Sequence, residues 1–137
     1  MKFQKIVHFL VFEYSKVGNR EDSNIFIRNK VKAANYLNID INLYRYSSNC
    51  TKSALIDRIH ELNENKSVHG IVVQLPFESK LNLNPIDYIY TVLPEKDVDG
   101  LHFINAGKLL YGNPKGDAFA PCAARACYEL IKSTNES

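Results

Sequence analysis

The sequence predicts an α/β fold, a three-layer α/β/α sandwich around a mainly parallel sheet, built as one domain over residues 1–137. Apolar strands and amphipathic helices alternate along the first half of the chain. Their connections have the length that joins parallel strands through right-handed crossovers. With 137 residues, 45% of them hydrophobic, the chain is long enough for one core. We therefore expect a single core with the first strand at the centre of the sheet.

The first strand and the first helix are predicted near the start of the chain. Residues 6–14 are rich in Val, Ile, Phe and Tyr without clean alternation, which is typical of a strand covered on both faces. A polar loop is expected at 15–22. Ser23 can then cap a helix that ends at Asn38. The apolar positions of this helix follow a 3.6-residue period at Ile27, Val31, Ala34 and Leu37.

Two more strands and four more helices are predicted further along. Residues 39–43 alternate between apolar and polar, and Thr51 opens a helix with one apolar face. Residues 70–75 form the most buried strand. Asn84 caps a helix whose first residue is a proline, a favoured start. The apolar face of the second helix is Leu55, Ile59 and Leu62, and the last two helices are expected at 104–110 and 121–132.

Composition excludes several classes of partner. The net charge is +2 and the charges are interspersed, so nucleic acid is not an expected partner. No apolar stretch approaches the roughly 20 residues of a membrane span, so no membrane partner is expected. Cys50, Cys122 and Cys127 have no metal-ligand spacing, and an odd count fits a reducing compartment. We expect buried thiols at Cys122 and Cys127, and no metal site. The histidines, which are expected on the surface or packed, are His8, His60, His69 and His102.

Two polar residues stand where packing alone would not place them. Gln74 ends the apolar third strand, and Asp99 lies in a tight turn. Each needs a polar partner, and ligands of parallel sheets bind beyond the carboxyl ends of the strands. On the first helix, Ser23, Phe26 and Lys30 are spaced three and four apart and so share one face. Together these residues suggest a pocket.

Each of these residues also has an ordinary explanation. A lysine on a helix surface, such as Lys30, is usually solvated and inert. Gln74 can be a core amide satisfied by backbone groups, and Asp99 with Gly100 makes a good turn pair. Composition and spacing leave both readings open.

Four segments resemble the folate-binding catalytic domain of the methylenetetrahydrofolate dehydrogenase/cyclohydrolase family. They are 17–30 (VGNREDSNIFIRNK), 68–76 (VHGIVVQLP), 94–101 (PEKDVDGL) and 104–109 (INAGKL). The motifs are long and correctly ordered and spaced, and the resemblance covers 17–131. The sequence of these motifs is most similar to the amino-terminal part of eukaryotic trifunctional C1-tetrahydrofolate synthases. The resemblance implies an enzyme of folate one-carbon metabolism and purine biosynthesis, located in the cytoplasm or alternatively in mitochondria, with the family's homodimer as an open alternative.

The resemblance also implies catalytic roles for two residues. In the family, the lysine at the place of Lys30 is the general acid/base. The glutamine at the place of Gln74 hydrogen-bonds that lysine and helps to tune its proton affinity. Burial beside apolar groups lowers a lysine's pKa from about 10.4 toward neutrality, where it can exchange protons at working pH.

The same resemblance assigns the folate contacts. The aspartate at the place of Asp99 anchors the pterin, because a carboxylate can accept two parallel hydrogen bonds from the ring nitrogen and the exocyclic amine. Asp97 is expected to be structural. Phe26 would stack on the aminobenzoyl ring, and Leu75 and Pro76 would form an apolar wall. The expected substrate-binding set is Ser23, Phe26, Leu75, Pro76 and Asp99.

Three residues depart from the family's pattern, and the family's cofactor has no binding motif in this chain. Phe26 replaces an aromatic residue that carries a hydroxyl, and Ala123 and Ala124 replace threonine and proline. The family binds NADP on a Rossmann domain, and no G-x-G-x-x-G occurs in this chain. We therefore expect a domain that is incomplete at both ends, with no cofactor-binding residue of its own. Cyclohydrolase is the activity expected to survive, and a non-catalytic folate-binding or interaction module is the alternative. Apolar surface left by the absent domain predicts self-association.

Overall fold

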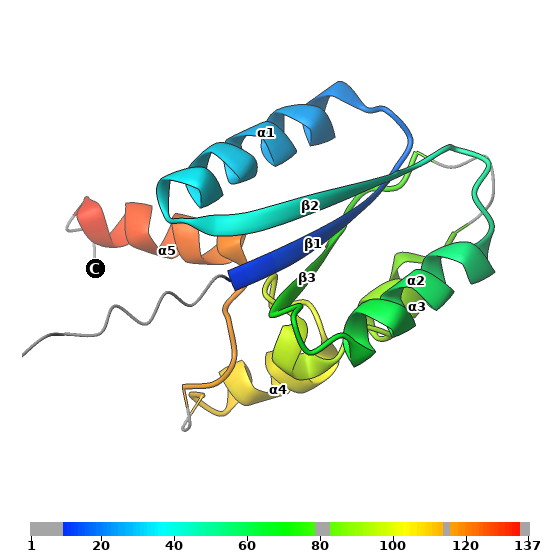
Figure 1. Ribbon diagram of the computed structural model, residues 1–137. Helices are drawn as coiled ribbons and strands as arrows, with labels where there is room; N and C mark the ends of the chain where they lie inside the picture. Colours follow the sequence, from blue (N-terminus) through cyan, green and yellow to red (C-terminus); the bar gives the residue numbers. More distant parts are fainter. Residues whose placement is uncertain (1–9, 79–82, 114–115, 135–137) are drawn as a thin grey trace, which may run out of the picture.

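The structure is a computed structural model that describes residues 10–78, 83–113 and 116–134, and for residues 10–16 it describes the backbone alone (Figure 1). Strands and helices alternate up to β3, as the sequence predicts, and short helices follow. The elements are β1 (Leu10–Val17), α1 (Glu21–Tyr36), β2 (Ile39–Tyr46), α2 (Lys52–Glu64), β3 (Gly70–Gln74), α3 (Pro85–Ile89), the 3-10 helix η1 (Pro94–Lys96), α4 (Phe103–Leu110) and α5 (Cys122–Ser133).

The three described strands form a parallel sheet in the order β2-β1-β3. Leu10 of β1 lies opposite Ile39 of β2, and Phe12 of β1 lies opposite Gly70 of β3. The predicted central place of the first strand is confirmed. The carboxyl ends of β1 and β3 therefore meet at one edge of the sheet.

Helices α1 and α2 cover opposite faces of this sheet (Figure 1). In β3, Ile71 and Val73 pack in one cluster with α2, while Val72 between them packs with Ile27 of α1. Side chains alternate between the two faces of a strand, so this division follows from the strand's geometry. The predicted apolar face of α2 is fully inside, with Leu55 and Ile59 at 0% exposure.

The start of α1 differs from the prediction. The strand β1 continues to Val17, and α1 begins at Glu21 after Arg20, whose side chain makes no capping bond. Ser23 is not the cap but a buried residue of the first turn. The carboxylate of Asp22 accepts a hydrogen bond from the Ser23 N–H at 2.7 Å, so the acid satisfies a free helix donor instead. The predicted strand residues 6–9 lie outside the described residues.

The other predicted helix ends are confirmed. The Thr51 side chain accepts a hydrogen bond from Ala54 N at 3.2 Å, and the Asn84 side chain accepts one from Ile86 N at 3.1 Å. Asn38 adopts a positive φ of 54° directly after α1, as residues that stop a helix often do.

Lys96 fastens the end of α2 to the turn that carries Asp99. Its ammonium donates to the carbonyl oxygens of Leu62, Asn63 and Asn65 at 2.8, 2.7 and 2.8 Å. The last carbonyls of a helix lack partners within the helix and carry partial negative charge. One cation therefore bonds the carbonyls of Leu62 and Asn63 in the last turn and that of the C-cap residue Asn65, which also accepts a hydrogen bond from Val68 N.

Replacing Lys96 with methionine should lower the free energy of unfolding by about 2 kcal/mol, because charge-assisted hydrogen bonds to partly buried carbonyls are lost. Urea unfolding followed by circular dichroism measures this. The exposed Lys66 provides the control, since Lys66→Met should leave the transition unchanged. Equal midpoints for the two variants would contradict the capping role.

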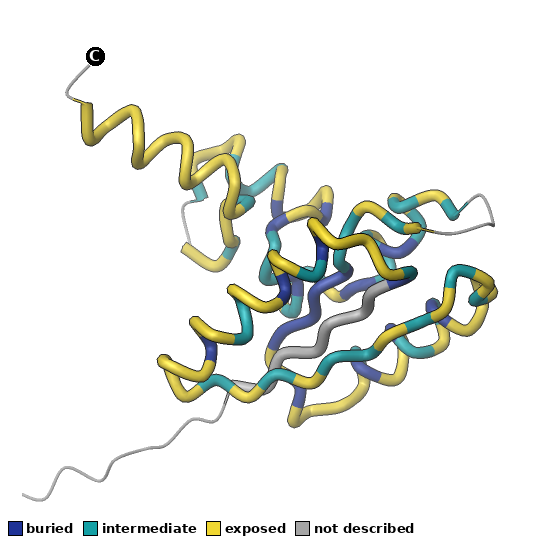
Figure 2. Tube along the Cα trace, turned by 90° about the horizontal axis from the view of Figure 1, so that it is seen from above, coloured by how far each residue is buried: buried dark blue, intermediate teal, exposed yellow. Residues whose placement is uncertain are grey.

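Helix α5 stands away from the rest of the described chain (Figure 2). Every residue from Cys122 to Ser133 is exposed. The expectation of buried thiols at Cys122 and Cys127 is therefore wrong, because burial depends on a neighbour and α5 packs its length on none of the described elements. Within the described residues, no helix has both the length and the apolar character needed to cross a bilayer.

Candidate functional site

A pocket of about 270 Å³ opens at the carboxyl end of β3, between α1 and the turn that contains Asp99. It brings together all seven residues that the sequence nominated as a site. Those residues are Ser23, Phe26, Lys30, Gln74, Leu75, Pro76 and Asp99. Sequence reasoning did not nominate the other lining residues, which are Asp22, Val73, Leu101, Pro121, Cys122 and Ala123.

Helix α1 supplies one wall of the pocket. Ser23, Phe26 and Lys30 lie on successive turns of the same face, as their spacing predicts. Ser23 is 3% exposed, whereas Phe26 is 63% exposed. The serine is thus closed off from solvent, while the phenyl ring is free to cover a flat ligand.

Lys30 and Asp99 form an ion pair across the pocket. The Lys30 Nζ lies 3.5 Å from Asp99 Oδ1, and the two side chains are 26% and 21% exposed. Burial raises the pKa of the Asp99 carboxyl, and the neighbouring Lys30 ammonium offsets part of that rise. A partly buried acid and base in contact are typical of functional sites.

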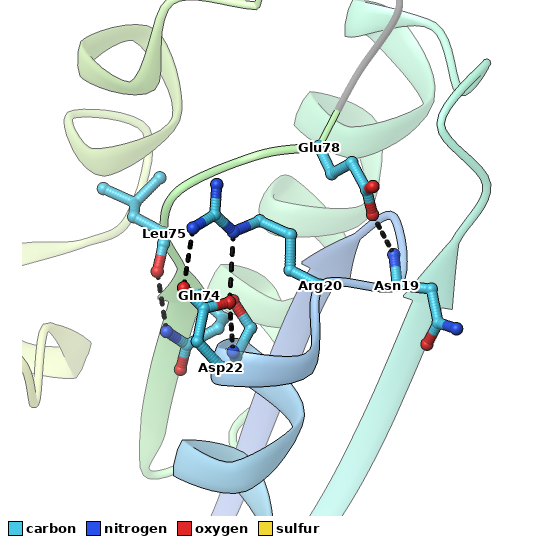
Figure 3. Close-up of polar contacts among 7 residues, drawn as sticks. Asn19, Arg20, Asp22, Gln74, Leu75 and Glu78 are labelled. Atoms are coloured by element: carbon cyan, nitrogen blue, oxygen red, sulfur yellow. Dashed lines mark hydrogen bonds and ion pairs between the residues drawn. The ribbon is translucent and has the colours of Figure 1, made fainter.

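The side-chain amide of Gln74 uses its nitrogen in a hydrogen bond, whereas its oxygen has no donor among the described residues. Its Nε2 donates to the Leu75 carbonyl oxygen at 2.8 Å (Figure 3). Its Oε1 is buried and accepts no hydrogen bond from the described residues. A buried acceptor without a donor costs about 1–3 kcal/mol. The Gln74 oxygen can therefore accept a hydrogen bond from a group that the described residues do not supply.

Asp97, expected to be structural, organises the turn behind Asp99. Its carboxylate is 5% exposed and accepts hydrogen bonds from Leu101 N, His102 N and Asn105 Nδ2 at 3.2, 2.9 and 2.9 Å. These bonds tie the turn to the first turns of α4. The acid two residues before Asp99 thus positions the acid that lines the pocket.

Two neighbours complete this turn. Gly100 adopts a positive φ of 67°, and a Cβ there would stand 2.1 Å from the Phe119 carbonyl oxygen, so only glycine fits. His102 is 4% exposed, and its Nδ1 accepts a hydrogen bond from Ile104 N at 3.1 Å, which caps α4. His102 is therefore a packed capping residue, while His60 and His69 are exposed and His8 lies outside the described residues.

A polar network holds the loop before α1 (Figure 3). Arg20 donates to Asp22 through Nε at 3.1 Å and Nη2 at 2.6 Å, and Asn19 N donates to Glu78 Oε2 at 2.6 Å. The Arg20 contact lowers the pKa of Asp22 to about 2. Asp22 thus presents a carboxylate at the pocket edge. The position of Asp22 directly before Ser23 was the sequence signal that could have identified it as a pocket residue.

One larger hollow lies outside the nominated residues. This groove of about 770 Å³ runs between α1 and β2 and is lined by residues such as Ile27, Arg28 and Leu43. None of the seven nominated side chains lines it. The described residues contain no cluster of three His, Cys, Asp or Glu that could hold a metal ion.

Comparison with known proteins identifies relatives of this domain. The family model "Tetrahydrofolate dehydrogenase/cyclohydrolase, catalytic domain" matches residues 5–99. The cytoplasmic C-1-tetrahydrofolate synthase of Homo sapiens is 45% identical over 87% of this chain, which spans 13% of that protein. The bifunctional protein FolD of Chlamydia trachomatis is 41% identical over 85% of this chain, which spans 39% of FolD.

Solved structures agree with the sequence matches. The 5,10-methylenetetrahydrofolate dehydrogenase of Bombyx mori superimposes with a TM-score of 0.81 at 36% identity, covering 92% of this chain and 42% of the silkworm chain. The Trypanosoma brucei dehydrogenase-cyclohydrolase, solved with NADP cofactor and inhibitor, superimposes with a TM-score of 0.82 at 31% identity. The aligned region covers 93% of this chain and 42% of the trypanosomal chain.

Proposed function

Because this chain belongs to the tetrahydrofolate dehydrogenase/cyclohydrolase family, as a catalytic domain of folate one-carbon metabolism, we propose that its pocket binds a tetrahydrofolate derivative and hydrolyses the methenyl form. One observation carries the proposal. The Lys30–Asp99 pair and the unpartnered oxygen of Gln74 line the same cavity, although they come from three separate segments. The chain covers less than half of its relatives, so the activity of the longer protein is part of the proposal.

In this proposal Lys30 moves the proton. Hydrolysis joins a water oxygen to the methenyl carbon, after which one carbon–nitrogen bond breaks. Acting as the base, the Lys30 side chain takes one proton from the attacking water and returns it to the departing nitrogen. The remaining hydroxyl proton is released to solvent as the formyl carbonyl forms, so the cationic methenyl form and water give the formyl product and one proton. Gln74 Oε1 is the buried acceptor that can hold the lysine in place.

Asp99 orients the substrate. Its carboxylate would accept two hydrogen bonds from the pterin, exchanging its contact with Lys30 for contacts with the ligand. Phe26 would stack on the aminobenzoyl ring, Leu75 and Pro76 would line the apolar wall, and Ser23 would contribute a hydroxyl.

Hydride transfer needs a cofactor that these residues do not fit. The family's cofactor is NADP, and a structure of the trypanosomal relative contains it. This chain has no glycine-rich motif for a pyrophosphate, and none of the residues lining the pocket is assigned to it. We therefore assign the dehydrogenase step to the longer family protein.

The proposal extends to the setting of the domain. In β3, Ile71 and Val73 pack with α2 while Val72 packs with α1, which supports the three-layer α/β/α sandwich for the whole domain. Its similarity to synthases named as cytoplasmic supports a cytoplasmic location. A homodimer is also proposed.

Isothermal titration calorimetry with tetrahydrofolate tests binding, and loss of methenyltetrahydrofolate absorbance tests turnover. We expect saturable heat and hydrolysis above the buffer rate. Soluble, folded protein that releases no heat with tetrahydrofolate would overturn the proposal.

As the pH is lowered, the affinity for tetrahydrofolate should begin to fall at a higher pH than it would if Asp99 had the pKa of an ordinary aspartate. The pterin needs the Asp99 carboxylate, and burial raises the pKa of this carboxyl, so its protonation begins earlier as pH falls. Calorimetry across a pH series in wild-type and Asp99→Asn protein measures this. The acidic loss should be present in the wild type and missing in the variant, and identical pH profiles would contradict it.

A further inference from the structure

We propose that Glu78 is a positioning residue for folate binding, because it fastens the apolar wall formed by Leu75 and Pro76 to the loop before α1. Glu78 itself does not line the pocket, whereas both wall residues do. The inference rests on the proposed function, since the ligand that the wall receives is the proposed folate.

Two hydrogen bonds join Glu78 to the segment between β1 and α1. The Glu78 N–H donates to the Val17 carbonyl oxygen at 3.2 Å. The Glu78 Oε2 accepts a hydrogen bond from Asn19 N at 2.6 Å (Figure 3). A carboxylate that accepts from a backbone N–H makes a stronger bond than a neutral acceptor does. We call these two bonds the Glu78 clasp.

Gly18, between the two residues that the clasp holds, allows this close approach. Its φ is 84°, and a Cβ built on it would collide with the Cβ and the carbonyl oxygen of Glu78. Only a residue without a side chain fits at this point. The two loops therefore meet backbone against backbone, and the contact is specified from both sides.

Phe77 holds the wall from the side opposite the clasp. Its ring packs edge-on against the ring of Tyr88, with centroids 5.0 Å apart and an interplanar angle of 89°. Tyr88 is 0% exposed and belongs to the core cluster beneath α2. Leu75 and Pro76 thus lie between the end of β3 and two anchored residues. Of those two, only Glu78 is exposed, so it can be replaced without opening the core.

The clasp joins the two segments that face each other across the pocket. Helix α1 supplies Ser23 and Phe26, and the loop after β3 supplies Leu75 and Pro76. The separation of these segments sets the room for the aromatic ring that would lie on Phe26. A wall that is already in place avoids the cost of ordering it when the ligand binds. The apparent dissociation constant rises by the inverse of the fraction of molecules that have the wall in place.

Replacing Glu78 with alanine should raise the dissociation constant of tetrahydrofolate about 3–10-fold, as expected if the wall is in place in roughly a third to a tenth of the molecules. Glu78→Gln removes the charge but keeps an oxygen that can accept from Asn19 N, so it should bind nearly as tightly as the wild type. Calorimetry measures the three constants. Glu64→Ala, an exposed change on α2, should bind like the wild type, and circular dichroism checks that every variant is folded.

Amide exchange followed by NMR tests the clasp itself, without folate. The Asn19 N–H should exchange slowly in the wild type and in Glu78→Gln and lose its protection in Glu78→Ala. The Gly18 N–H, which donates to the Tyr46 carbonyl oxygen at 3.0 Å, is the internal control and should exchange equally in all three proteins.

Three results would overturn the inference. Equal exchange of the Asn19 N–H in the wild type and Glu78→Ala would show that the clasp does not hold this loop. Equal affinity of these two proteins, or a Glu78→Gln variant that binds as weakly as Glu78→Ala, would remove its role in binding. Failure of the proposed function would look different, because the wild type itself would then release no heat with tetrahydrofolate.

Discussion

Replacing Lys30 with alanine should lower the rate of methenyltetrahydrofolate hydrolysis by about 10²–10⁴-fold, the usual contribution of a positioned general acid/base. Lys30 is the amine in contact with Asp99 inside the pocket. Its removal should act mainly on kcat, because the apolar wall and Asp99 that hold the folate remain. The decrease in absorbance of the methenyl form under saturating substrate measures this directly.

Lys32 is the matched control for that experiment. It lies two residues further along α1, is exposed and does not line the pocket. Lys32→Ala should hydrolyse at the wild-type rate. If Lys30→Ala also keeps the wild-type rate, Lys30 has no catalytic role. If neither protein exceeds the buffer rate while tetrahydrofolate still binds, a non-catalytic folate-binding module is favoured.

Replacing Asp99 with asparagine should weaken tetrahydrofolate binding by about 10–100-fold, since a charged acceptor of two hydrogen bonds contributes roughly 1.5–3 kcal/mol. Asparagine has almost the same shape but offers one acceptor and one donor, so it cannot accept both pterin bonds. Calorimetry provides the dissociation constant. Asp57→Asn, an exposed change on α2, should bind like the wild type.

The stability of Asp99→Asn separates lost binding from lost folding. The pKa of Asp99 is raised in the folded protein, so the charged form is disfavoured by folding. Stability is therefore lost as pH rises through that pKa. Asparagine removes this cost, and the variant should unfold at the same or a higher urea concentration at neutral pH. A lower midpoint together with weak binding would attribute the effect to folding instead.

Much of the fold was predictable because local signals and burial agree. Thr51 carries a capping hydroxyl directly before an apolar helical period, and the structure uses both. The meeting of Lys30, Gln74 and Asp99 was predictable for another reason. Parallel strands joined by crossovers place their carboxyl ends on one edge, so residues far apart in sequence meet there.

The rest depended on contacts that a linear sequence does not show. Ser23 is a good residue for a helix start, and so is Asp22, yet α1 begins at Glu21 after Arg20, which makes no side-chain capping bond. The structure puts Asp22 at the pocket edge, held by Arg20. Cys127 is apolar enough for a core, yet no described element covers its helix, because burial is set by tertiary packing.

The turn around Asp97 has a consequence for substrate choice. Asp97 holds this turn against α4, and Lys96 holds it against the end of α2, so the Asp99 side of the pocket is braced from two directions. The opposite rim ends in the solvent-facing ring of Phe26. We therefore expect the pocket to discriminate strictly among folate derivatives that differ in the heterocycle. At the Phe26 side of the pocket, we expect it to accept folate derivatives that differ in the rest of the molecule.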